Sequence, residues 1–128
     1  AIYEGVVFSH MTHLNRMRER FTDVHTLRVT GGPAHSDVWM QMLADVSGLR
    51  IELPQVEETG CFGAALAARV GTGVYHNFNE AQRDLRHPVR TLLPDMTAHQ
   101  LYQQKYQRYQ HLIAALQGFH ARIKEHTL

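Results

Sequence analysis

The stretch LRVTGGPAHS, from Leu27 to Ser36, decides the fold, because it combines a strand with a tight turn and the start of a helix. Leu27 and Val29 alternate with polar residues, which predicts a short strand with one buried face. Gly31 and Gly32 then permit backbone angles that are closed to other residues, and they leave no side chain to keep a ligand away. The stretch therefore predicts a strand that ends in a turn open to a ligand.

A helix is expected to begin directly after this turn. Pro33 and Ser36 suit a first helical turn, because proline gives up no needed N–H there and serine can cap the helix. Such a helix start points free N–H groups and a partial positive charge at whatever lies over the turn. We therefore expect an anion or a polar ring to bind at this place.

The residues that follow complete a strand–helix–strand unit. A helix is predicted over 38–46, with Trp39 in the core and Gly48 closing the helix at its C-terminal end. A second short strand follows over 50–53, and Pro54 ends it. Two strands and a helix within about 30 residues form a βαβ unit, which implies parallel strands joined by a right-handed crossover.

Helices are predicted on both sides of this unit. Residues 1–21 carry a single apolar stripe at helical spacing, formed by Val7, Met11, Leu14 and Phe21. A third helix over 59–70 is poor in bulky side chains, and its small face consists of Gly60, Gly63, Ala64, Ala67 and Ala68. This face favours close packing against another backbone, with a helix start that faces a ligand as the alternative.

The last third of the chain is predicted to be a connector followed by a long helix. Residues 71–94 contain several glycine, asparagine and proline breakers, which predict an irregular segment with a short helical turn over 80–85. From about Thr97 one apolar stripe follows helical spacing: Tyr102, Tyr106, Tyr109, Ile113, Leu116 and Ile123. We expect this helix to pack along the domain, because Gly118 and His120 interrupt a coiled-coil seam.

Composition excludes several classes of protein. With 128 residues, of which 44% are hydrophobic, the chain can fill one core, so it is one domain or a piece of one. The 13 basic and 12 acidic residues are spread along the chain and leave a net charge of +1, which argues against a nucleic-acid partner. No apolar run approaches the roughly 18 residues of a membrane span. The single Cys61 fits a reducing compartment, so we expect a cytoplasmic protein.

The sequence gives weak support for a metal site or for a nucleophilic catalytic residue. The 10 histidines suggest a metal site, and His10 and His13 share a helix face, but no HExxH pattern or acidic partner at ligand spacing accompanies them. Cys61 is predicted to be a packed residue, because no charged neighbour is placed to activate it. Glu57 and Glu58 precede a helix start, where carboxylates act as caps and dipole partners. We therefore predict no metal site and no catalytic residue in this chain.

Two common nucleotide motifs are incomplete here. A dinucleotide site needs G-x-G-x-x-G after the strand and an acid at the end of the next strand. Glu52 stands at a suitable distance, but Gly31 and Gly32 supply an adjacent pair without a third glycine. No lysine follows the turn as in a P-loop. The glycine pair therefore favours close approach of a flat purine or a ribose over a wrapped triphosphate.

The segment TGGPAHSDVWMQMLADVSGLRIELPQVEETGCFGAALAARVGTGVY resembles the C-terminal lobe of the FGGY carbohydrate kinases. That family shows a strand, a Gly-Gly turn, then W/L-x-Q-x-x-A-D-x-x-G, a second strand, P-x-x-E and G-A-A-x-x-A in the same order and spacing. The likeness covers residues 27–75, and the segment from Tyr102 resembles the closing helix of the family. The resemblance divides the chain into a nucleotide-binding part over 1–75, a connector over 76–94 and a C-terminal helix over 95–128.

The resemblance implies an α/β fold, as part of an actin-like, ribonuclease-H-like ATPase lobe with short parallel strands, flanking helices and a long C-terminal helix. It also implies transfer of the γ-phosphoryl group of ATP, with Mg, to a hydroxyl of a ketose such as L-xylulose. In relatives the adenosine end of ATP rests on the glycine turn, which corresponds here to Gly31, Gly32, Ala34 and Ser36. Pro33 and His35 depart from the family, which often has a third glycine and a basic residue at these positions.

The same resemblance places the catalytic aspartate and the sugar contacts in an N-terminal lobe that has no match in this chain. We therefore expect a part of a sugar kinase that is inactive alone, that binds ATP or ADP, and that reaches its sugar through the missing lobe. A homodimer through the surface meant for that lobe is also expected. Two alternatives stay open: an interaction module that uses the Tyr102–Ile123 helix, and an NAD-binding domain in which Glu52 holds the ribose.

Overall fold

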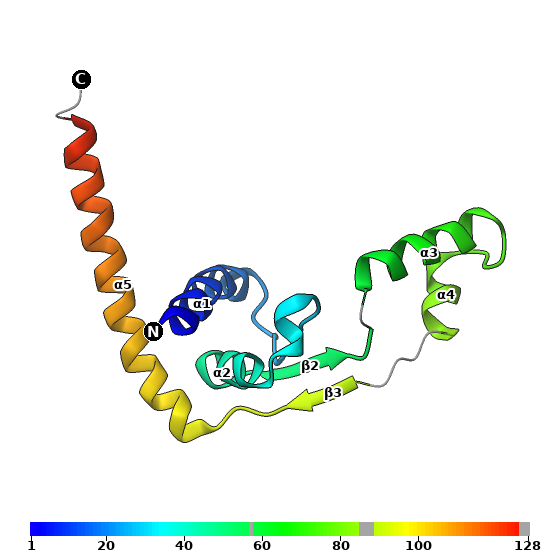
Figure 1. The fold of residues 1–128 in the computed structure, drawn as a ribbon, viewed down its shortest axis with the longest axis horizontal. Helices are drawn as coiled ribbons and strands as arrows, with labels where there is room; N and C mark the ends of the chain where they lie inside the picture. Colours follow the sequence, from blue (N-terminus) through cyan, green and yellow to red (C-terminus); the bar gives the residue numbers. More distant parts are fainter. Residues whose placement is uncertain (57, 85–88, 126–128) are drawn as a thin grey trace.

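The computed structural model describes residues 1–56, 58–84 and 89–125, which form a mixed α/β structure (Figure 1). The elements in chain order are α1 (Ile2–Arg20), β1 (Thr26–Arg28), η1 (Gly32–His35), α2 (Asp37–Ser47), β2 (Arg50–Pro54), α3 (Thr59–Gly71), α4 (Phe78–Asp84), β3 (Val89–Leu92) and α5 (Met96–Glu125). The predicted helices and the two predicted strands are confirmed to within a few residues. None of the described helices is both long and apolar enough to cross a membrane.

The sheet of the described residues has the strand order β1-β2-β3. β1 and β2 pair in parallel, with Leu27 opposite Ile51, which confirms the predicted βαβ unit. β2 and β3 pair antiparallel, with Leu53 opposite Arg90. The prediction of an irregular connector over 71–94 is therefore wrong for β3. The first three residues of β3 are exposed, so the segment shows no alternation of buried and exposed residues. It is a strand because it pairs with β2.

Among the described residues, two apolar clusters form the core. The larger lies between α1, α2 and α5 and consists of Val7, Phe8, Met11, Leu14, Val46, Leu49 and Tyr106. The smaller joins α2 to the sheet and consists of Met40, Ala44, Ile51 and Leu53. On the apolar stripes of α1 and α2, two residues are exposed instead: Phe21 caps the end of α1 and is 57% exposed, and Val38 in the first turn of α2 is 74% exposed. Trp39 is half-buried, and its ring centroid lies 5.0 Å from that of Tyr3.

The first half of α5 packs against α1 through aromatic rings. The ring of Phe8 lies 6.4 Å from that of Tyr102, 5.7 Å from that of Tyr106 and 5.5 Å from that of Tyr109. The hydroxyl groups of Tyr106 and Thr12 are 3.1 Å apart. These contacts confirm that α5 packs along the domain and explain the first part of its apolar stripe.

The second half of α5 leaves the body of the structure (Figure 1). Leu116, which was predicted to continue the buried stripe, is 52% exposed. The side chain of Ile123 lies outside the described residues. Helical periodicity identifies which residues share a face, but a face is buried only where another element lies against it.

The hairpin of α3 and α4 lies apart from the sheet (Figure 1). α3 contains no buried residue among those described, and a Cβ built at Gly60 or Gly63 would meet no heavy atom within 4 Å. The close packing predicted for this face is therefore not found in the described part of the chain. Cys61 is exposed, so its prediction as a packed residue is wrong. Glu58 precedes α3 without a side-chain cap bond, and Glu57 lies outside the described residues.

An ion pair joins α1 to α5. Lys105 Nζ donates to Glu4 Oε1 at 2.7 Å. This hydrogen bond lowers the pKa of the Glu4 carboxyl below its usual value of 4.5, and it raises the pKa of Lys105 above 10.5. The contribution of Glu4 to stability is therefore complete above pH 4.5 and is lost as the pH falls through its lowered pKa.

We predict that Glu4→Gln flattens the acid limb of the stability curve. As the pH falls below 4.5, the free energy of unfolding of the unsubstituted chain should fall more steeply than that of the variant, because only the unsubstituted chain has this carboxylate to protonate. Urea unfolding at several pH values measures both slopes. Glu58→Gln is the matched control and should leave the slope unchanged; equal slopes for Glu4→Gln and the unsubstituted chain would contradict the prediction.

Candidate functional site

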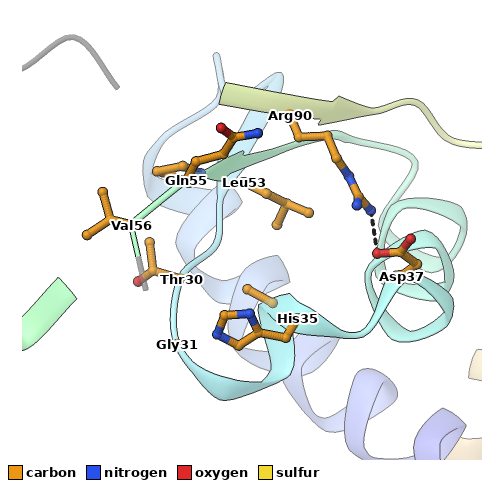
Figure 2. A pocket seen from close by; sticks show the side chains of 10 residues that line it. Thr30, Gly31, His35, Asp37, Leu53, Gln55, Val56 and Arg90 are labelled. Carbon is orange, nitrogen blue, oxygen red and sulfur yellow. Dashed lines mark hydrogen bonds and ion pairs between the residues drawn. The ribbon is translucent and has the colours of Figure 1, made fainter. Parts of the chain in front are cut away.

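A cavity of about 430 Å³ opens where the parallel strands β1 and β2 end (Figure 2). The residues that line it come from three places: the turn after β1, the end of β2 and the facing pair from α2 and β3. They are Thr30, Gly31, Ala34 and His35; Leu53, Pro54, Gln55 and Val56; and Asp37 and Arg90. In α/β folds the carboxyl ends of parallel strands are the usual place for a ligand.

The turn after β1 has a backbone conformation that requires glycine. Gly31 has φ of 94° and ψ of −176°, a combination open essentially to glycine alone. Its carbonyl accepts from the N–H of Ala34 at 3.0 Å, which starts the 3₁₀ helix η1. Pro33 stands in the first turn of η1. The turn therefore places Ala34 and His35 on the wall of the cavity.

Two of the four predicted nucleotide residues line this cavity. Gly31 and Ala34 are on its wall, whereas Gly32 and Ser36 are not among the lining residues. Ser36 instead caps α2, since its Oγ accepts from the N–H of Trp39 at 3.4 Å. Pro33 and Ser36, expected in one helix start, therefore belong to two successive helices, η1 and α2.

Other lining residues were missed, and some of them could have been found. Leu53 and Pro54 end β2, and Gln55 and Val56 follow it; a parallel neighbour of β1 must end at the same edge of the sheet. The predicted βαβ unit therefore contained the signal for this wall. Arg90 had no such signal, because it reaches the cavity through an antiparallel strand formed by a segment predicted to be irregular.

An ion pair closes one side of the cavity. Arg90 Nη2 donates to Asp37 Oδ1 at 2.6 Å, and Figure 2 shows the Arg90 side chain running from β3 toward the start of α2. The two side chains are 43% and 72% exposed. Such a pair contributes little to stability at the surface. Its consequence for the site is that it places a guanidinium on the wall of the cavity.

The described residues offer no metal centre and no dinucleotide site. No group of three or more His, Cys, Asp or Glu side chains in the described ranges is placed to hold a metal ion, and this includes the region of His10 and His13. Glu52, the candidate ribose ligand, accepts from Arg28 Nη2 at 2.8 Å and does not line the cavity.

Comparison with known proteins identifies the fold family. Residues 1–72 match the C-terminal domain of the FGGY family of carbohydrate kinases. The chain belongs to this family. The family is described as one of carbohydrate kinases. The resemblance seen in the sequence is confirmed.

Curated FGGY relatives are similar over most of the chain. The L-xylulose/3-keto-L-gulonate kinase of Escherichia coli (strain K12) is 98% identical over 128 residues, which are 100% of this chain and 26% of that protein. A probable L-xylulose kinase of Haemophilus influenzae is 52% identical over 92% of this chain and 24% of that protein. The chain therefore spans about a quarter of the length of these relatives.

A solved structure shares the fold. The ligand-bound xylulose kinase from Lactobacillus acidophilus superimposes with a TM-score of 0.78 at 21% identity, over 91% of this chain and 24% of that chain. The match supports the mixed α/β arrangement of a kinase C-terminal lobe, including the long α5. The predicted fold class is confirmed.

We predict that Gly31→Ala destabilises the chain by about 1–3 kcal/mol, because alanine is strained at this φ and ψ. Gly32→Ala is the matched control: Gly32 has no positive φ, and a Cβ there would meet no heavy atom within 4 Å. It should change the free energy of unfolding by less than about 0.5 kcal/mol. Urea unfolding measures both values, and equal destabilisation by the two variants would refute the prediction.

Proposed function

We propose that this chain is the nucleotide-binding C-terminal part of an ATP-dependent sugar kinase, and that the adenosine end of ATP rests at the cavity beside the glycine turn. The observation that carries the proposal is the coincidence of this cavity with Gly31 and Ala34 at the carboxyl ends of β1 and β2. In the proposed complex Gly32 leaves room for the ligand. Ser36 fixes the start of α2, because its side chain caps that helix.

The chemistry of the cavity suits a nucleoside better than a triphosphate. Gly31 and Ala34 present little side chain, and Leu53 and Val56 offer apolar surface to a flat ring. Gln55 supplies an amide, which can both donate and accept hydrogen bonds at the polar edge of a base. Arg90, the cation opposite the turn, is already held by Asp37. The phosphates therefore extend away from this cavity in the proposed complex.

The sugar and the reacting groups lie outside this chain in the proposal. The names of the relatives point to a ketose, and L-xylulose is the proposed substrate class. Phosphoryl transfer needs a carboxylate to accept the hydroxyl proton and charges around the phosphates. The described residues hold no group of three or more metal-ligating side chains, and in the proposal the contacts to Mg and to the phosphates come from the parts that this chain lacks.

The division of the chain follows the same proposal: residues 1–75 bind the nucleotide together with Arg90 of β3, the rest of 76–94 connects, and 95–128 contain the closing helix α5. The alternative of an interaction module needs the apolar stripe of the C-terminal helix to be free for a partner. Tyr106 of this stripe is buried against α1, so the alternative is less favoured. The proposed self-association uses the surface meant for the missing lobe. Leu112, Leu116 and Phe119 are exposed on the second half of α5.

The proposal predicts that the chain alone transfers no phosphoryl group. Replacing the matching segment of the E. coli relative with this chain gives a full-length chimera. The chimera carries the parts of the kinase that this chain lacks. The chimera should phosphorylate L-xylulose in the presence of ATP and Mg, whereas the isolated chain should not. A coupled assay of ADP release measures both, and turnover by the isolated chain would show that the catalytic groups lie within these residues.

A second prediction tests the nucleotide site in the chimera. Ala34→Leu places three more carbons in the cavity and should raise the KM for ATP by about tenfold, with the KM for L-xylulose unchanged. Ala114→Leu, at an exposed position of α5, is the matched control and should change neither constant. An unchanged KM for ATP in Ala34→Leu would place the nucleotide elsewhere and overturn the proposed function.

A further inference from the structure

Arg90 reaches the cavity from a part of the chain that the FGGY match does not cover. The match ends at residue 72, whereas Arg90 lies on β3. Its backbone is fixed by pairing with β2, where it stands opposite Leu53, a buried residue that also lines the cavity. The position of this arginine is therefore determined by the sheet, and the family pattern in the first 72 residues does not include it.

The guanidinium of Arg90 is fixed as well as its backbone. Its Nη2 donates to Asp37 Oδ1 at 2.6 Å, and Asp37 is the first residue of α2, directly after the cap Ser36. Asp37 thus holds one edge of the guanidinium at the boundary of the cavity, as Figure 2 shows. A guanidinium held at one edge can still present a flat face to a ligand, and it loses less freedom when that ligand binds.

The other residues that line the cavity indicate which kind of ligand group would pack against the guanidinium of Arg90. The cavity is bounded by the turn at Gly31, by Ala34, and by the apolar side chains of Leu53 and Val56. These groups accommodate a flat ring, and a planar cation packs well against the face of an aromatic ring. A purine offers two fused rings to this contact, whereas a pyrimidine offers one.

We propose that Arg90 is a specificity-determining residue, whose Asp37-held guanidinium packs against the base and selects purine over pyrimidine nucleotides as the phosphoryl donor. This inference rests on the proposed function, because it takes the base to lie in the cavity. Asp37 acts as a positioning residue through the guanidinium. The contact depends on the planar shape of arginine as well as on its charge.

The test compares ATP with CTP in the full-length chimera at saturating L-xylulose. Arg90→Ala should lower kcat/KM for ATP by about fivefold and change that for CTP by less than about twofold, so the ATP/CTP ratio falls. Arg90→Lys should lower the ratio to a similar extent, because lysine keeps the ion pair with Asp37 but has no flat face. Asp37→Asn should give an intermediate fall.

Arg28→Ala is the matched control. Arg28 stands on β1 in an ion pair of 2.8 Å with Glu52, does not line the cavity, and should leave the ATP/CTP ratio unchanged. If Arg90→Lys leaves the ATP/CTP ratio of kcat/KM unchanged, the positive charge and its ion pair with Asp37 account for the role of Arg90, and the inference fails. Equal losses for ATP and CTP would overturn it in the same way. Both results leave the effect of Ala34→Leu on the KM for ATP intact, so they are distinct from failure of the proposed function.

Discussion

The buried carboxylate of Asp45 is the constraint on which the arrangement of the C-terminal half depends. Asp45 is 8% exposed, and its Oδ1 accepts from the side chain of Gln41 and from the backbone N–H of Asp95, each at 2.8 Å. Gln41 also donates to the carbonyl of Leu93 at 2.9 Å. A buried carboxylate is costly unless hydrogen bonds satisfy it, so the segment between β3 and α5 is held against α2.

This constraint connects the core to the candidate site. α2 holds the segment after β3 through the bonds of Asp45 and Gln41 to Asp95 and Leu93, and the start of β3 through the pair of Asp37 with Arg90. Its N-terminus is fixed by Ser36, and its C-terminus by Gly48 in the left-handed conformation, with φ of 68°. α2 therefore sets the distance between the glycine turn and the wall formed by β3. The cavity is a consequence of how one helix is anchored at both ends.

Local chemistry made much of the site predictable. The positive φ of Gly31 and the cap of Ser36 follow from residue type and spacing, and both were expected. Gln41 and Asp45, part of the family pattern, act on the packing of α5 and do not line the cavity, a role that the pattern did not reveal. Arg90 was not predicted, because its place at the site depends on a partner strand far away in the sequence.

The sequence by itself determined the helices, the parallel pair β1 and β2 and the glycine turn, because propensity, caps and turn residues act over a few neighbouring positions. The tertiary structure decided which faces are buried. It buried Phe8 under three tyrosines and left Val38 and Cys61 exposed. It also made a strand of β3 and brought Arg90 to the cavity. Burial and antiparallel pairing depend on which distant element lies opposite, and no local pattern encodes that element.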